Sequence, residues 1–177
     1  VLFRSRKLMI LKKNLVFLGM MGSGKSSIGY LVSKKLNLTF IDIDNLIEAE
    51  TGKSISKIFQ EKGENYFRNL EEKITLNALK GTGDVVSLGG GSFINNKIRK
   101  EVLINHFSFW LNCDESVLLK RIKGSKKRPL AFYSTDQKIK HLIKKRSKIY
   151  SKAEFKINCD KLTKTEIVKK IIKIYEL

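Results

Sequence analysis

A glycine-rich loop between a strand and a helix limits what this chain can fold into. Residues 19–26 read Gly-Met-Met-Gly-Ser-Gly-Lys-Ser, the complete pattern G-x-x-x-x-G-K-[ST]. They follow the apolar run 15–18 and precede a stretch with helical spacing, 27–36. In this context backbone N–H groups converge on phosphates, the lysine reaches the β and γ oxygens, and the serine hydroxyl can ligate Mg²⁺. A turn without a ligand needs neither the lysine nor the serine, so the loop predicts a nucleoside triphosphate site.

Short apolar runs alternate with longer helical patterns, which is typical of a parallel sheet covered on both faces. The expected strands are 14–18, 38–43, 85–88, 107–111 and 154–157. The expected helices are 26–36, 45–51, 54–60, 64–80, 114–122, 137–152 and 164–175. Gly52 and Gly63 are expected to stop the helices that precede them. With 177 residues, 42% of them hydrophobic, the sequence predicts a single α/β domain, a parallel five-stranded sheet flanked by helices.

The charge balance is strongly basic, with 36 Lys and Arg against 17 Asp and Glu, a net charge of +19. Such a charge would suit nucleic acid, an acidic membrane surface or anionic small molecules. Because lysines occur in nearly every segment, a sequence-wide compositional bias explains much of the excess. The longest apolar runs are far shorter than a membrane span. We therefore expect a small-molecule partner, and no nucleic acid or membrane.

The cysteines and histidines show no metal-binding spacing. Cys113 and Cys159 are far apart in the sequence, and His106 and His141 stand alone. Two lone cysteines in a chain without a secretory pattern fit a reducing compartment. The sequence therefore predicts a cytoplasmic protein, in which residues 1–8 are interpreted as a frayed or extended start, or a non-native extension.

Two acids close the second expected strand, and a triple glycine follows the third. In an open parallel sheet, ligands lie beyond the carboxyl ends of the strands. Asp42, Asp44 and the glycines 89–91 should therefore converge on the phosphate loop. One carboxylate can help to hold Mg²⁺ through water, and the other can accept or orient a substrate hydroxyl proton for in-line attack. The alternative for Asp44 is N-capping of the helix expected from Asn45.

An arginine and a glutamate are spaced to face each other on one helix. Glu71 lies three residues after Arg68 and can hold its guanidinium in a fixed orientation. A positioned arginine suits a substrate carboxylate, whereas a surface ion pair is the alternative. The neighbouring aromatic residues Phe59, Tyr66 and Phe67 are interpreted as core rather than as a substrate wall.

The stretch 123–136 contains a glycine, several basic residues and the only proline, and we interpret it as a flexible loop. Its mobility would let it close over ATP as a lid and bring Arg128 to the transferring phosphoryl group. A solvated run of charges is the alternative. In the next expected helix, Arg146 and Tyr150 are four residues apart and share a face, a pair that is weak evidence by itself.

Taken together, these motifs resemble those of the shikimate kinase family, in the same order from about Leu15 to the last helix. The resemblance rests on the phosphate loop, 40–44, 51–55, 58–59, 63–64, 67–71, 87–91, 128–130 and the pair at 146 and 150. It implies a P-loop kinase fold similar to that of nucleoside monophosphate kinases, with a mobile lid and a monomeric state. It also implies transfer of the ATP γ-phosphoryl group to the 3-hydroxyl of shikimate, giving shikimate 3-phosphate and ADP on the route to chorismate and aromatic amino acids. Two departures are Ala131, where a second leucine is common, and a loose match at 158–160.

Carried over position by position, the resemblance implies a role for each site residue. Asp44 contacts the ring hydroxyls and orients or deprotonates the accepting one. Arg68 and Arg146 bind the shikimate carboxylate, and the Gly90 backbone completes this side. ATP and Mg²⁺ are the implied cofactors, with Ser26 and Asp42 serving the metal. Lys25 and Arg128 act on the phosphates, Arg121 stacks on adenine, and the nucleotide-binding set is Gly22, Ser23, Gly24, Lys25, Ser26, Ser27, Arg121 and Arg128.

Two other classes of function stay open from the residues alone. Another small kinase of the same fold, for gluconate or a nucleoside monophosphate, would use the two arginines for a different anion. A nucleic-acid-binding ATPase or regulator is suggested by the net charge of +19 and predicts binding that weakens steeply with salt. That second class leaves the set of Asp44, Arg68 and Arg146 unexplained.

Overall fold

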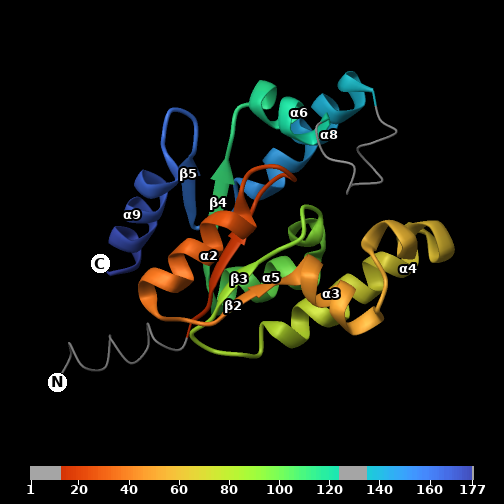
Figure 1. The fold of residues 1–177 in the computed structure, drawn as a ribbon, viewed down its shortest axis with the longest axis horizontal. Helices are drawn as coiled ribbons and strands as arrows, with labels where there is room; N and C mark the ends of the chain where they lie inside the picture. Colours follow the sequence, from red (N-terminus) through yellow and green to blue (C-terminus); the bar gives the residue numbers. More distant parts are fainter. Residues whose placement is uncertain (1–12, 124–134, 177) are drawn as a thin grey trace.

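The computed structural model describes residues 13–123 and 135–176, which form one sheet with helices packed on both of its faces (Figure 1). The sheet has five strands in the order β2-β3-β1-β4-β5, and all neighbouring pairs are parallel. The prediction of an α/β fold with five parallel strands flanked by helices is confirmed. The interpretation of 1–8 and most of the proposed lid lie outside the described residues.

The strands are close to those expected from the apolar runs. They are β1 (Leu15–Leu18), β2 (Phe40–Asp42), β3 (Val85–Ser87), β4 (Phe107–Asn112) and β5 (Phe155–Asn158). The helices are α2 (Lys25–Leu36), α3 (Ile43–Thr51), α4 (Ile55–Ala78), η1 (Ser92–Ile94), α5 (Asn96–Asn105), α6 (Glu115–Lys123), α8 (Asp136–Tyr150) and α9 (Lys164–Tyr175). Within this described part of the chain, no helix combines the length and the apolar character that crossing a membrane requires.

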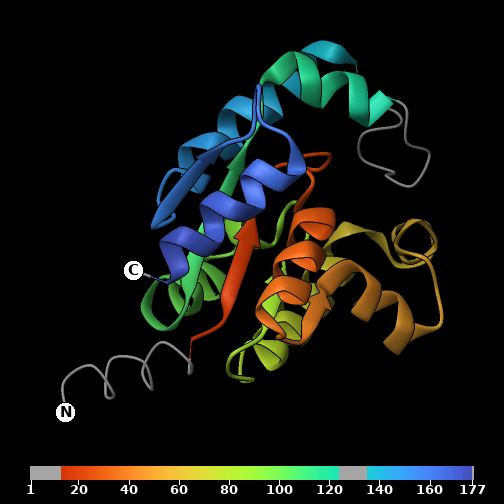
Figure 2. The same cartoon turned by 60° about the vertical axis from the view of Figure 1, so that its left-hand side comes forward.

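The alternation of side chains in β1 divides the core into two parts. Leu15 and Phe17 pack with apolar side chains of α2 and α9, while Val16 and Leu18 pack with those of the helices on the opposite face. Figure 2 shows α2 and α9 covering the same side of the sheet, and the two helices are in contact. All four β1 side chains are fully buried. The phosphate loop therefore follows the most protected strand of the sheet, which fixes its position.

Helix α4 differs from the expectation of two separate helices. It runs through Gly63, whose backbone is non-helical (φ 80°, ψ 174°), so two helical segments join at a kink there. Glycine adopts this positive φ without a Cβ clash. The residue predicted as a stop is therefore a bend, and it directs the second segment, which carries Arg68 and Glu71, along the sheet. Helix α5 and the short helix η1 were not predicted; only Ile98 and Val102 of α5 are buried, too few for a clear pattern.

A buried amide anchors the start of β1 to the loop before β3. The Asn14 side chain donates from Nδ2 to the carbonyl oxygens of Gly81 (2.8 Å) and Leu79 (3.3 Å). Its Oδ1 accepts from the Asp84 N–H at 2.9 Å. The residue is completely buried. One side chain thus satisfies three backbone groups that would otherwise lose hydrogen bonds on folding.

We expect Asn14→Ala to lower the free energy of unfolding by about 2–4 kcal/mol, because buried backbone groups lose their partners. Urea denaturation of the wild type and of the variant measures the difference in the free energy of unfolding. Asn105→Ala is the matched control: Asn105 is exposed and bonds only Glu101 among the described contacts, so its loss should change stability by no more than about 0.5 kcal/mol. Equal effects of the two substitutions would contradict the anchoring role.

Candidate active site

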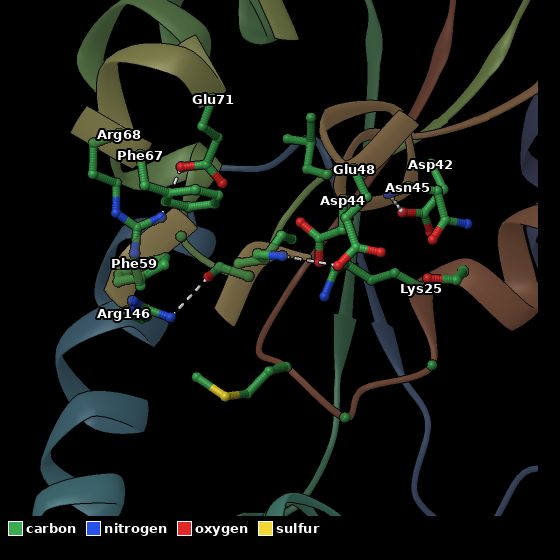
Figure 3. A pocket seen from close by; sticks show the side chains of 18 of the residues that line it. Lys25, Asp42, Asp44, Asn45, Glu48, Phe59, Phe67, Arg68, Glu71 and Arg146 are labelled. Carbon is green, nitrogen blue, oxygen red and sulfur yellow. Dashed lines mark hydrogen bonds and ion pairs between the residues drawn. The ribbon is translucent and has the colours of Figure 1, made fainter. Parts of the chain in front are cut away.

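A pocket of about 500 Å³ opens at the carboxyl ends of β1, β2 and β3. Figure 3 shows Lys25 and Asp42 on one side of it, Arg68 and Arg146 on the other, and Asp44 between them. The four segments that supply these residues are far apart in the sequence. The pocket is lined by ten of the thirteen predicted catalytic, binding and metal residues, which are Gly22, Gly24, Lys25, Ser26, Ser27, Asp42, Asp44, Arg68, Gly90 and Arg146.

The phosphate loop folds tightly between β1 and α2. Gly19 has φ 141°, and a Cβ there would lie 2.8 Å from the Leu111 carbonyl oxygen, so only glycine fits. Gly24 (φ 93°) is the N-cap of α2 and turns the chain into the helix. The Lys25 ammonium donates to the carbonyl oxygens of Gly19 (3.0 Å) and Met20 (3.1 Å). The loop therefore combines the N-terminal end of a helix with a held positive charge, a combination that favours phosphate.

The other residues of the predicted nucleotide set lie around this loop. Ser26 is exposed in the first turn of α2, while Ser23 is buried, and its hydroxyl has no hydrogen-bond partner within the described structure. The exposed Arg121 of α6 donates from Nη1 to the Gly22 carbonyl oxygen at 3.0 Å. Arg128 lies outside the described residues. Lys123 and Asp136, the ends of the stretch interpreted as a lid, form an ion pair at 2.8 Å.

The two acids after β2 differ in what they do. Asp42 Oδ1 accepts from the Asn45 N–H at 3.2 Å, so Asp42 is the N-cap and α3 begins at Ile43. The alternative of capping by Asp44 is therefore wrong, because the strand gives way to the helix two residues earlier than expected. Asp44 lies in the first turn, with Oδ1 2.7 Å from where a Gly89 Cβ would be. Its carboxylate thus lies directly beside the glycine turn.

Arg68 is held by carboxylates rather than by solvent. Its Nη1 donates to Glu71 Oε2 at 2.7 Å, and its Nη2 lies 3.3 Å from Glu64. The Glu71 side chain is only 4% exposed and also accepts from Ser92 Oγ at 2.6 Å, so the alternative of a surface ion pair is wrong. Burial would lower the pKa of Arg68, but the charges and hydrogen bonds of Glu71 and Glu64 outweigh it and raise the pKa. Arg68 therefore stays cationic beside the pocket.

Arg146 reaches the pocket from α8 and is buried. Its Nη1 donates to the Gly90 carbonyl oxygen at 3.0 Å. The Tyr150 hydroxyl donates to the same oxygen, and burial raises the pKa of Tyr150 to about 12, so it remains a donor. The i, i+4 spacing placed the two residues on one helix face, but the sequence did not indicate that they share a single backbone acceptor.

The triple glycine allows two side chains and the phosphate loop to approach the turn closely. A Cβ at Gly89 would lie 2.5 Å from Glu71 Oε1, and one at Gly91 would lie 2.5 Å from Arg68 Nη1. At Gly90 it would lie 3.2 Å from the backbone nitrogen of Met21 in the phosphate loop. The turn is therefore the point where Arg68 and Glu71 on one side meet the phosphate loop on the other.

Aromatic rings form part of the wall beside the arginines. Phe59 and Phe67 line the pocket, with ring centroids 4.6 Å apart, and the Arg68 guanidinium lies 5.2 Å from the Phe67 ring. Phe67 is buried and Phe59 half-buried, so these two residues serve both core and wall. Tyr66 is 49% exposed. The prediction that it belongs to the core is wrong, because it lies on the outer side of α4.

A phosphate loop, an acid opposite it and two arginines at the far end define a P-loop kinase that acts on a small anionic acceptor. The shikimate kinase family model matches residues 21–176. The shikimate kinase of Thermodesulfovibrio yellowstonii is 39% identical over 93% of this chain and 95% of its own length. That of Sulfurihydrogenibium sp. is 41% identical over 90% and 96%. The chain belongs to the shikimate kinase family and is an ATP-dependent small-molecule kinase.

Solved structures agree with this assignment. Shikimate kinase from Acinetobacter baumannii, in complex with shikimate, has a TM-score of 0.88 at 27% identity and covers 95% of both chains. Shikimate kinase from Aquifex aeolicus has a TM-score of 0.82 at 37% identity, covering 92% of this chain and 96% of its own. A gluconokinase from Sinorhizobium meliloti (TM-score 0.55, 17% identity, 94% and 93% coverage) shares the fold alone. The family assignment therefore favours shikimate kinase activity over the open alternative of another small kinase of the same fold.

We expect Gly91→Ala to fold but to raise the KM for the acceptor roughly 10- to 100-fold, since the new methyl group displaces the flexible end of Arg68 and small misplacements at a site are costly. The KM for ATP should change little, because the phosphate loop is not touched. Steady-state kinetics with each substrate varied in turn measures both values.

The control for this prediction is the double variant Gly91→Ala/Arg68→Ala. If the methyl group acts through Arg68, the double variant should be no worse than Arg68→Ala alone, which is the non-additivity expected of residues in contact. Additive losses would show that Gly91→Ala acts elsewhere.

Proposed function

We propose that this chain transfers the γ-phosphoryl group of ATP to the 3-hydroxyl of shikimate, giving shikimate 3-phosphate and ADP. The observation that carries the proposal is the placement of Lys25 and the pair Arg68 and Arg146 at opposite sides of one pocket, with Asp44 between them. This arrangement suits an acceptor with a carboxylate at one end and hydroxyls at the other. The product enters the route to chorismate and aromatic amino acids.

Arg68 and Arg146 bind the shikimate carboxylate. Arg68 is oriented by the buried Glu71, and Arg146 by the Gly90 carbonyl oxygen. Guanidinium groups bind carboxylates through directed, charge-assisted hydrogen bonds. The Gly90 backbone forms the floor of this side, and the rings of Phe59 and Phe67 exclude water around it. The acceptor is thereby fixed with its hydroxyls toward the phosphate loop.

Asp44 contacts the ring hydroxyls and accepts or orients the proton of the attacking 3-hydroxyl. Its carboxylate lies beside the Gly89 turn, between the arginines and Lys25. In phosphoryl transfer the protein mainly positions the reactants and stabilises charge. Lys25 neutralises the β- and γ-phosphate oxygens, supported by the backbone N–H groups of Gly22, Ser23 and Gly24 and by Ser27 in the first turn of α2. We assign Arg128 to the phosphates of the closed state and Arg121 to the adenine face.

The chain offers oxygen donors for Mg²⁺ at the phosphate loop. Ser26 and Asp42 line the same pocket, and a hydroxyl, a carboxylate and phosphate oxygens suit this ion, which usually keeps several waters. Within the described residues, no three His, Cys, Asp or Glu side chains form a metal cluster, so the donor set fits a metal carried by the nucleotide. Ser26 and Asp42 would hold Mg²⁺, Asp42 through water, and the bound ion would neutralise charge on the transferring phosphoryl group.

We further propose that the chain acts as a cytoplasmic monomer and forms one kinase domain with a lid at about 123–136. The ion pair between Lys123 and Asp136 supports the choice of lid boundaries, because it joins the two ends of that stretch. The charge of +19 serves anionic small molecules in this proposal, and nucleic acid is not a partner.

The proposed function is tested by coupled ADP release with Mg-ATP and a panel of acceptors. Shikimate, gluconate, nucleoside monophosphates and single-stranded DNA are each compared with a blank that lacks an acceptor. Shikimate alone should stimulate ADP release. Stimulation by another acceptor and not by shikimate would overturn the assignment of Arg68 and Arg146 to a shikimate carboxylate.

Asp44→Asn should lower kcat by about 10²- to 10⁴-fold, the usual contribution of a general base, with little change in ATP affinity. The amide keeps the size of the side chain but cannot take the proton. Glu50→Gln, an exposed change near the other end of the same helix, is the control and should leave kcat unaltered. A kcat of Asp44→Asn close to that of the wild type would remove the proposed role.

A further inference from the structure

The two cysteines, which lie far apart in the sequence, end adjacent strands of the sheet. Cys113 follows the last residue of β4, and Cys159 follows the last residue of β5. Asn112 and Asn158 are register partners, and the Cys159 N–H donates to the Asn112 carbonyl oxygen at 2.8 Å. The ladder therefore continues to the cysteines. Neighbouring strands lie about 4.8 Å apart, within the range of Cα separations of about 4.4–6.8 Å that a disulfide spans.

The two thiols also affect each other's pKa. Both pack against the same apolar cluster, with Cys113 buried and Cys159 half-buried. A hydrogen bond with the Cys159 thiol lowers the pKa of Cys113, and the nearby Arg121 guanidinium acts in the same direction, against burial. The same hydrogen bond, together with burial, raises the pKa of Cys159. The lowered pKa of Cys113 favours it as the attacking thiol, and the raised pKa of Cys159 favours it as the resolving thiol.

Cys113 is in direct contact with the phosphate loop. Its thiol lies 3.6 Å from the carbonyl oxygen of Ser23, a buried contact. Arg121, which lowers the pKa of Cys113, donates to the carbonyl oxygen of Gly22 in the same loop. If the Cys113 sulfur moved toward β5, it would lose its contact with Ser23. The phosphate loop would then shift, although its backbone at Gly19 already packs closely against the Leu111 carbonyl oxygen.

We propose that Cys113 and Cys159 are a modification site, at which a peroxide oxidises the pair to a reversible disulfide that weakens ATP binding. The Cys113 thiolate attacks one peroxide oxygen, the O–O bond breaks, and hydroxide leaves with a sulfenic acid on Cys113. The sulfur of Cys159 then attacks the Cys113 sulfur, the S–O bond breaks, and the hydroxyl leaves as water with the Cys159 proton. The two thiols lose two electrons, which reduce the peroxide to water. A dithiol reverses the step by thiol–disulfide exchange.

The pair is separate from the acceptor side. The arginines and Asp44 contact the glycine turn at 89–91, whereas Cys113 contacts the phosphate loop. Oxidation should therefore raise the KM and the Kd for ATP by a larger factor than the KM for shikimate. A coupling of ordinary size between two sites predicts a change of about fivefold or more.

The full chain, first reduced and then freed of reductant, is treated with hydrogen peroxide in its native state. Peptide mass spectrometry looks for Cys113 and Cys159 joined with the loss of two hydrogens, and calorimetry measures the Kd for ATP before and after. We expect a cross-linked pair, a weaker Kd and full recovery with dithiothreitol. Thiols that stay unlinked, or a linked pair with an unchanged Kd, would overturn the proposal.

Two variants keep the test independent of folding and of the proposed function. Cys159→Ser alters the more exposed cysteine, and in it peroxide should leave Cys113 at the sulfenic acid, without the disulfide. Cys113→Ser removes the attacking sulfur, so peroxide should give neither the sulfenic acid at position 113 nor the disulfide. A loss of fold in this variant would not affect the Cys159→Ser result. Because cross-linking and the ATP Kd do not require turnover, they remain informative if shikimate is not phosphorylated. A peroxide-dependent rise in Kd that persists fully in Cys159→Ser would contradict the role of the disulfide.

Discussion

The site depends on the turn formed by the three consecutive glycines 89–91. At 89–91 the backbone passes so close to Glu71, Arg68 and the phosphate loop that no Cβ fits without moving one of them. Two side chains of α8 hold this turn in place, because Arg146 and Tyr150 both donate to the Gly90 carbonyl oxygen. Because three elements meet at a point with no spare volume, the position of each fixes the others. The buried Glu71 adds to this, since a buried carboxylate requires its partners to stay in place.

The nucleotide side and the acceptor side are built in different ways. The phosphate loop is local: eight consecutive residues after a fully buried strand set its shape. The acceptor side combines α3, α4, the glycine turn and α8, which come together only in the folded sheet. A local motif survives changes elsewhere in the fold, whereas an assembled surface responds to any of its elements.

The sequence predicted what depends on hydrophobic pattern and on local motifs. The five strands and most helices followed from apolar spacing, and the phosphate loop followed from its own residues. It could not predict that Gly63 bends one helix rather than ending it, because glycine permits both and only packing decides. It left open whether Asp44 caps α3, since two acids in alternate positions are equivalent until the end of the strand is known. Ser92 belonged to no motif, and Tyr150 was predicted only to share a helix face with Arg146. The roles of both depend on partners 21 and 60 residues away.

The cysteine pair is another feature that the sequence could not predict. Cys113 and Cys159 are far apart along the chain, which argued against a common site. The parallel register of β4 and β5 nevertheless brings them next to each other at one edge of the sheet. The carboxyl edge of such a sheet gathers the ends of all its strands, so residues just beyond strand ends are the ones most often brought together. β1 ends in the phosphate loop, and β4 and β5 end in the two thiols, one of which touches that loop. A chemical change at the ends of β4 and β5 therefore reaches the phosphate loop by direct contact.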